Sequence, residues 1–209
     1  GNSAVAVVCG RAGIHASYGY PGTRSTEAID KGLSQAQDRI TVGWSVNEAV
    51  AVSVGVGHAM AGRDCVVTMK IPGLYQACDA FTSVSCYMQP KGALIYYIAS
   101  DFTPSSTQHV IDPRYLFKSC FVPVFEPRTH QEMHEAAGLA ADISRTHRTP
   151  VVILAGGLLC HREGPVNLAE QHKPPPPHVG PPAHPNALPG LDHTSYEHAI
   201  AAHRRGPLH

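Results

Sequence analysis

Short apolar stretches alternate with amphipathic segments of helical length along about the first 160 residues. The pattern predicts extended segments at 14–18, 39–44, 64–69, 93–99 and 150–154, and helices at 3–12, 23–37, 74–88 and 130–145. Strands separated by helices indicate βαβ units, which build a mostly parallel sheet. The sequence therefore predicts an α/β fold: a doubly wound, mostly parallel sheet of about six strands with helices on both faces.

Residues 48–59 do not follow the helical pattern. Val alternates there with Ala, Ser or Gly, and a period of two is typical of a strand. The β-branched Val side chains also lower helix propensity. By pattern alone this segment is predicted to be a strand.

The composition changes near residue 163. Residues 172–209 hold nine of the eighteen prolines and seven of the fourteen histidines, with little apolar periodicity. Such a segment is typically extended and polyproline-like. We expect a folded domain over 1–163 and an irregular tail over 164–209, with a possible short helix at 194–204.

Charge and cysteine content exclude several classes of protein. Sixteen basic and sixteen acidic residues give zero net charge, which argues against nucleic-acid and anionic-membrane binding. No apolar run approaches the ~20 residues that span a bilayer, and the start does not resemble a signal peptide. The six cysteines form no C-x-x-C pair, which indicates reduced thiols and no cluster or zinc ribbon within this chain. We expect a cytoplasmic protein without a metal site of its own.

The loop Gly19–Thr23 (GYPGT) directly follows a predicted strand and precedes a predicted helix. Ligands gather at the carboxyl ends of strands in open α/β sheets, and glycines allow the backbone to approach a ligand closely. Tyr20, Pro21, Gly22 and Thr23 are therefore candidate ligand contacts. A tight strand–helix turn explains the same residues equally well.

Glu48 is the only charged residue between positions 40 and 62, His58 being counted as neutral. Apolar neighbours and the lack of a local cation disfavour a charged carboxylate, which makes Glu48 a candidate proton carrier. The alternative is an ordinary glutamate at the start of a helix, with Asn47 or Ser45 as the cap.

Two further strand ends carry polar residues. Lys70 and Gly73 lie in KIPGL after the strand at 64–69, and Gln108 lies in the loop SSTQH at 105–109. Both segments can equally be solvated turns. His130 and His134 lie four residues apart on one predicted helix, but no H-E-x-x-H motif supports a metal site there.

Four segments, taken in order, resemble the pyrimidine-binding (Pyr) domain of thiamine diphosphate enzymes: GNSAVAVVCGRAGIHASYGYPGTRSTEAI, GWSVNEAVAVSVGVGHAMAGRDCVVTMKIPGL, SSTQHVIDPRYLF and TPVVILAGGLLCHREGPV. Similarity is greatest to the N-terminal domain of the indolepyruvate ferredoxin oxidoreductase α-subunit, and it covers about residues 1–166. The resemblance implies the thiamine diphosphate-binding fold of Pyr type. It also implies a helix over 47–61, against the strand that the pattern predicts.

By this resemblance Glu48 is the catalytic glutamate that hydrogen-bonds N1′ of the aminopyrimidine of thiamine diphosphate. Tyr20, Pro21, Gly22, Thr23 and Gly73 are the further cofactor contacts that it implies. The resemblance also makes Thr23 a candidate contact to a 2-oxo acid substrate, together with Arg24, which stands where relatives usually have Pro and for which a solvated side chain is the alternative. Lys70 and Gln108 are further candidate substrate contacts because of their positions at strand ends. The small residues Ala49, Ala51, Ser53, Gly55 and Gly57 then suggest a close-packing face, which a second Pyr-type domain could contact.

The Gly-Asp-Gly motif, with which enzymes of this family hold the diphosphate and Mg²⁺, is absent from the sequence. The resemblance therefore implies a partner subunit with a diphosphate-binding (PP) domain that holds the Mg²⁺. The expected assembly is a heterotetramer of two Pyr and two PP subunits.

The lack of closely spaced cysteines favours a non-oxidative reaction, in which the subunit helps to decarboxylate a 2-oxo acid and the resulting enamine is protonated or ligated. The expected enzyme is thus a decarboxylase or acyloin-type carboligase. One alternative is the α-subunit-like component of a 2-oxo acid ferredoxin oxidoreductase. Others are a non-catalytic interaction subunit whose tail docks a partner, and a tail that buffers metal ions.

Overall fold

A six-stranded parallel sheet forms the centre of the protein. The computed structural model describes residues 13–21, 40–100, 111–162 and 164–167. Within them the strand order is β2-β1-β3-β4-β6-β5, and every neighbouring pair is parallel. The strands are β1 (Ala16–Gly19), β2 (Thr41–Trp44), β3 (Cys65–Lys70), β4 (Leu94–Ser100), β5 (Val124–Phe125) and β6 (Val151–Gly156). The predicted α/β class is confirmed.

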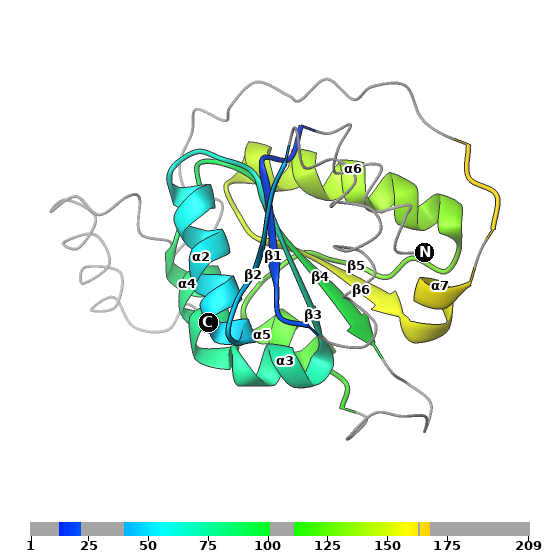
Figure 1. Ribbon diagram of the computed structural model, residues 1–209, viewed down its shortest axis with the longest axis horizontal. Helices are drawn as coiled ribbons and strands as arrows, with labels where there is room; N and C mark the ends of the chain where they lie inside the picture. Colours follow the sequence, from blue (N-terminus) through cyan, green and yellow to red (C-terminus); the bar gives the residue numbers. More distant parts are fainter. Residues whose placement is uncertain (1–12, 22–39, 101–110, 163, 168–209) are drawn as a thin grey trace, which may run out of the picture.

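Helices cover both faces of this sheet (Figure 1). One face carries α2 (Glu48–Met60), α3 (Ile71–Gln76), α4 (Cys78–Tyr87) and α5 (Arg114–Ser119). The other carries α6 (His130–His147) and α7 (Gly157–His161). Each layer has its own apolar core, because alternate residues of the central strands point to opposite faces.

The strand predicted at 48–59 from the alternation of Val is wrong, since these residues form α2. The buried residues of this helix recur at intervals of three and four, and they are Glu48, Ala51, Val52, Gly55, Val56 and Ala59. Gly55 lies so close to β3 that an added Cβ would overlap a methyl group of Val67. Burial against the sheet therefore overrides the weak helix propensity of Val, and the helix implied by the family resemblance is confirmed.

The other predicted elements agree in part with the structure. The helix expected over 74–88 is two helices, α3 and α4, separated at Ala77, whose N–H turns back to the carbonyl of Gly73. The sequence pattern did not predict β5, α5 or α7. The helices expected at 3–12, 23–37 and 194–204 lie outside the described residues.

The buried hydroxyl of Tyr96 provides a test of the core. Tyr96 lies in β4 and is fully buried against Phe81, and none of the described residues forms a hydrogen bond with its hydroxyl. Burial raises the pKa of Tyr96, so the hydroxyl stays neutral. Because an unsatisfied polar group costs free energy, we expect Tyr96→Phe to stabilise the chain by about 1 kcal/mol in urea unfolding.

The neighbouring Tyr97 is the matched control for this change. The Tyr97 side chain points to the other face of the sheet from that of Tyr96, and its hydroxyl lies 3.3 Å from Sγ of Cys160. Tyr97→Phe should therefore lower the free energy of unfolding by roughly 0.5–1.5 kcal/mol. If Tyr96→Phe also lowered the free energy of unfolding, the Tyr96 hydroxyl would have a hydrogen-bond partner, and the predicted stabilisation would be wrong.

Candidate functional site

All six strands run in the same direction, so their carboxyl ends meet at one edge of the sheet. Tyr20 and Pro21 follow β1 there, Glu48 begins α2 after β2, and Lys70 ends β3. The N–H of Ser45 donates to the carbonyl of Gly19 at 2.8 Å and joins the ends of β1 and β2. The predicted candidates Gly22, Thr23, Arg24 and Gln108 lie outside the described residues.

Glu48 is the buried carboxyl group at this edge. Asn47 caps α2 through its Oδ1, which accepts a hydrogen bond from the N–H of Val50 at 2.8 Å, and this fixes Glu48 in the first helical turn. Glu48 is only 5% exposed, and its Oε2 atom has no hydrogen-bond partner within the part of the chain that the structure describes. A buried carboxyl oxygen without a donor is costly, so this atom is poised to bind a donor from another molecule.

Gly73 packs directly on the Glu48 carboxyl group. A Cβ atom added to Gly73 would lie 2.6 Å from both Cγ and Cδ of Glu48, and it would also overlap Oε1. Gly73 is buried in α3, which follows β3 without an intervening loop. The glycine therefore allows α3 to approach the carboxyl group, and the structure brings together two residues that lie 25 positions apart in the chain.

Lys70 lies at the same edge, but its side chain is on the other face of the sheet from Glu48 and Gly73. Met69 belongs to the core beneath α2, so Lys70, the next residue of the strand, starts from the opposite face. Its side chain is half-buried. The structure thus separates Lys70 from the side of the sheet on which Glu48 and Gly73 meet.

Several exposed apolar side chains lie near Glu48 in the chain or at the end of the neighbouring strand β1, and most of them are not among the site residues predicted from the sequence. They follow β1, end β2 and begin α2, and they are Tyr20 (40% exposed), Trp44 (43%), Val46 (80%) and Val50 (39%). Large apolar side chains that are exposed on a folded domain are candidate interaction residues. The signal in the sequence was the apolar run TVGWSV at a strand end, which resembles ordinary core.

The small residues of α2 do not form one face. Ala51 and Gly55 are buried against the sheet, whereas Ser53 and Gly57 are exposed. The close-packing face expected from the five small residues is therefore divided between the interior and the surface. Part of this small-residue content serves the contact of α2 with β3.

The described part of the chain offers neither a membrane span nor a metal cluster. None of its helices is long and apolar enough to cross a membrane. No group of three or more His, Cys, Asp or Glu side chains gathers there to hold a metal ion. His134 is buried, and Nε2 of His130 lies 2.6 Å from the carbonyl oxygen of Arg162.

Comparisons with known proteins identify relatives of the chain. It is 33% identical to the indolepyruvate oxidoreductase subunit IorA of Archaeoglobus fulgidus over 175 residues, which cover 81% of this chain and 28% of that subunit. Identity is 32% to IorA of Methanothermobacter marburgensis (84% and 28% covered) and 33% to IorA of Pyrococcus horikoshii (77% and 24%). The chain thus spans about a quarter of the length of these relatives. No protein-family model matches it.

A solved structure supports the fold. A 2-oxoglutarate:ferredoxin oxidoreductase from Magnetococcus marinus, with 2-oxoglutarate, coenzyme A and succinyl-CoA bound, superposes with a TM-score of 0.61. The identity is 16%, and the match covers 76% of this chain and 29% of that one. At this level of identity the likeness concerns the fold.

These relatives correct the reaction class predicted from the sequence. The prediction of a decarboxylase or carboligase, and hence of a lyase, is wrong, because the relatives are oxidoreductase subunits. It rested on the lack of closely spaced cysteines, which concerns only the residues of this chain. The finding favours the alternative, a component of a 2-oxo acid oxidoreductase. We conclude that the chain belongs to the family of the indolepyruvate oxidoreductase subunit IorA and has the Pyr-type fold of thiamine diphosphate enzymes.

Proposed function

We propose that this chain is the Pyr-type part of a heteromeric, thiamine diphosphate-dependent oxidoreductase. Its substrate is a 2-oxo acid of the indolepyruvate class, and ferredoxin accepts the electrons. The proposal rests on the buried carboxyl group of Glu48 at the carboxyl edge of a parallel sheet, because its Oε2 atom finds no hydrogen-bond partner in the described ranges of the chain. The names of the relatives support the oxidative reaction.

The residues at this edge fit the aminopyrimidine end of thiamine diphosphate. The ring nitrogen N1′ can share a proton with a carboxyl group, and such a bond satisfies the Oε2 atom of Glu48. Gly73 limits the positions open to the carboxyl group, and the Asn47 cap fixes the helical turn that carries it. Tyr20 and Pro21, at the end of β1, are further proposed contacts, together with Gly22 and Thr23.

In this proposal Glu48 holds a proton at Oε2, directed toward the ring nitrogen. When bound, the cofactor supplies an electron sink for carbon–carbon bond cleavage next to a carbonyl group. The low exposure of Glu48 keeps water from competing for the carboxyl group. We propose Thr23, Arg24 and Gln108 as contacts to the substrate carboxylate and carbonyl, but not Lys70, because it leaves β3 from the opposite face of the sheet.

The charged end of the cofactor needs residues that the given sequence does not contain. The chain has no Gly-Asp-Gly motif, and its described residues include no cluster of carboxylates that could hold Mg²⁺. We propose that a PP-domain subunit binds the diphosphate and Mg²⁺, in an assembly of two Pyr-type and two PP-type subunits. The exposed apolar side chains of Tyr20, Trp44, Val46 and Val50 supply the contact surface beside Glu48.

This interface predicts the effect of a charged substitution at Val46. We expect Val46→Lys to raise the Kd of the subunit complex about tenfold or more, because the new ammonium group loses water on assembly. Titration of the partner by calorimetry measures the change. Tyr115→Lys is the control, since Tyr115 on α5 is also 80% exposed but lies outside this patch. Equal affinities of the wild type and Val46→Lys would place the partner elsewhere.

The proposed reaction is tested on the enzyme reconstituted with a Gly-Asp-Gly-containing partner. One 2-oxo acid and one coenzyme A would give one acyl-CoA, CO₂, one proton and two electrons, which two molecules of ferredoxin or viologen accept. We expect 2-oxo acid-dependent reduction of the dye, with arylpyruvates among the substrates accepted. Release of CO₂ without reduction of dye or ferredoxin would contradict the proposal.

A further inference from the structure

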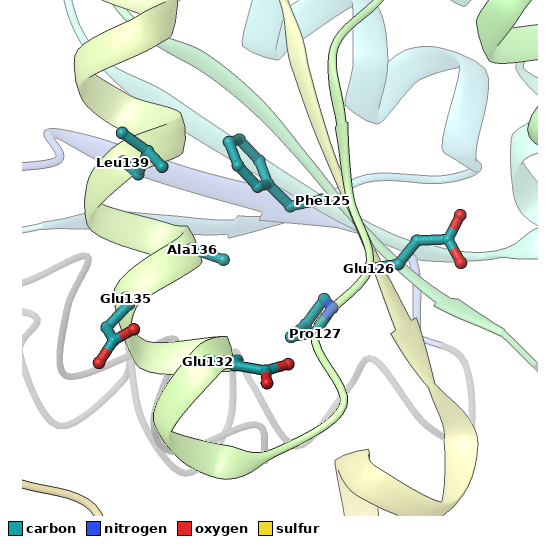
Figure 2. Close-up of a pocket in the computed structure, with 7 residues that line it drawn as sticks. All are labelled: Phe125, Glu126, Pro127, Glu132, Glu135, Ala136 and Leu139. Atoms are coloured by element: carbon teal, nitrogen blue, oxygen red, sulfur yellow. The ribbon is translucent and has the colours of Figure 1, made fainter.

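A groove lies beside β5, which is the edge strand at the other end of the strand order from β2. It has a volume of about 230 Å³ and runs between β5 and α6 (Figure 2). Its floor is apolar and consists of Phe125, Pro127, Ala136 and Leu139. Figure 2 shows the Phe125 ring directed toward Leu139, which is 49% exposed. β5 pairs only with β6, so this edge of the described sheet is open.

Three glutamates form the rim of the groove, and no Lys, Arg or His is among its lining residues. Glu126 is neutralised by Arg114, which donates to both carboxylate oxygens at 2.7 Å. Glu132 accepts from the N–H of Arg128 at 2.7 Å, and Glu135 accepts from the side-chain amide of Gln131 at 2.8 Å. Glu132 and Glu135 thus lie beside an apolar floor without an ion pair to any described residue, which suits a segment with both apolar and cationic residues.

The chain itself is held next to this rim. Beyond α7, Arg162 contacts His130, and Gly164 lies so close to the His130 ring that an added Cβ would be 2.6 Å from Nδ1. The N–H of Asn167 then donates to Oε1 of Gln131 at 2.9 Å. Because the amide group of the same Gln131 donates to Glu135, one side chain joins the described end of the chain to the rim.

The segment that follows Asn167 has enough residues to reach the groove, and its composition suits a groove with an apolar floor and acidic residues. From Gln131 to Leu139, α6 rises about 12 Å, at about 1.5 Å per residue. Three extended residues, 168–170, span roughly 10 Å. The sequence continues as QHKPPPP over 171–177, with Lys173 followed by four prolines. Proline-rich segments dock on aromatic-lined grooves with little loss of conformational entropy.

We propose that residues 171–177 occupy the groove between β5 and α6 of the same molecule. Lys173 then pairs with the rim carboxylates of Glu132 and Glu135, and the prolines that follow contact Phe125, Pro127 and Leu139. This docking is separate from the proposed catalytic site and does not depend on it.

Zero-length cross-linking of the full chain tests this docking. A carbodiimide joins a lysine amine to a carboxylate only when the two are in contact. We expect an intramolecular amide bond between Lys173 and Glu132 or Glu135, identified by mass spectrometry after proteolysis. Lys173→Arg should abolish it, because a guanidinium group does not couple. Mixing isotopically labelled and unlabelled chains distinguishes links within one molecule from links between two.

A groove variant and a matched control complete the test. Leu139→Arg should reduce the yield of the link about tenfold, since it removes an apolar contact and adds a like charge beside Lys173. Leu158→Arg should leave the yield unchanged, because Leu158 is 65% exposed on α7, outside the groove. Absence of the link, links only between molecules, or a yield unaffected by Leu139→Arg would each overturn the proposal.

Discussion

Glu48→Gln is expected to lower kcat of the reconstituted enzyme by about 10²–10⁴-fold, the range typical of a lost proton-transfer group. The amide matches the carboxyl group in size, so it fits against Gly73, but it cannot exchange a proton with a ring nitrogen. The measurement is the rate of 2-oxo acid-dependent dye reduction at saturating thiamine diphosphate. Circular dichroism and the elution volume of the complex should be unchanged.

Asp79→Asn is the control for this variant. Asp79 is an acidic residue in the first turn of α4, but it is exposed, whereas Glu48 is buried in the first turn of α2. We expect wild-type turnover for Asp79→Asn. If Glu48→Gln also kept wild-type turnover, the chain would be a non-catalytic interaction subunit, which is the alternative that the sequence analysis left open.

Gly73→Ala is expected to reduce kcat about 10²-fold, although residue 73 carries no side chain that could react. The added Cβ would lie 2.6 Å from Cγ and Cδ of Glu48, so either α3 or the carboxyl group must move. A displacement of about 1 Å in a catalytic group is sufficient for a loss of this size. Steady-state kinetics should show the loss mainly in kcat, with the KM for the 2-oxo acid less affected.

Gly57→Ala separates this effect from a general effect of alanine in a helix. An added Cβ at Gly57 of α2 would meet no atom within 4 Å. This control should keep full activity and gain up to about 1 kcal/mol in stability, because alanine favours the helix. Unchanged kcat in Gly73→Ala would show that the position of the Glu48 carboxyl group does not limit the reaction.

The sequence could indicate Glu48 because no other Asp, Glu, Lys or Arg lies between positions 40 and 62. It could not show the contact with Gly73, which depends on how two helices pack at the end of β3. Nor could it distinguish the exposed Trp44 and Val46 from core residues. Apolar residues are selected in the same way for burial in a core and for burial in an interface, so only the folded structure separates the two.

The errors in secondary structure have physical causes as well. The alternation of Val in 48–59 has the period of a strand, but burial of residues such as Ala51 and Gly55 against the sheet decides for a helix. β5 has only two residues and is defined by its pairing with β6, which no local pattern reveals. The division of 74–88 into two helices likewise follows from packing around Ala77, which is buried.

The residues of this chain alone could not indicate the reaction class. Oxidative and non-oxidative 2-oxo acid enzymes differ in where the electrons go after carbon–carbon cleavage, and electron carriers can lie on other parts of the protein or on other subunits. The widely spaced cysteines of this chain therefore did not bear on the question. Similarity to IorA, over about a quarter of that subunit, provided the correction.

The structure of the reconstituted complex with thiamine diphosphate bound would show directly which group binds N1′ of the aminopyrimidine. We predict that Oε2 of Glu48, which has no hydrogen-bond partner among the described residues, lies within hydrogen-bonding distance, about 2.6–3.2 Å, of N1′ of the aminopyrimidine. A complex in which N1′ is bound by another residue, with Oε2 of Glu48 satisfied by the partner subunit or still unpartnered, would contradict it.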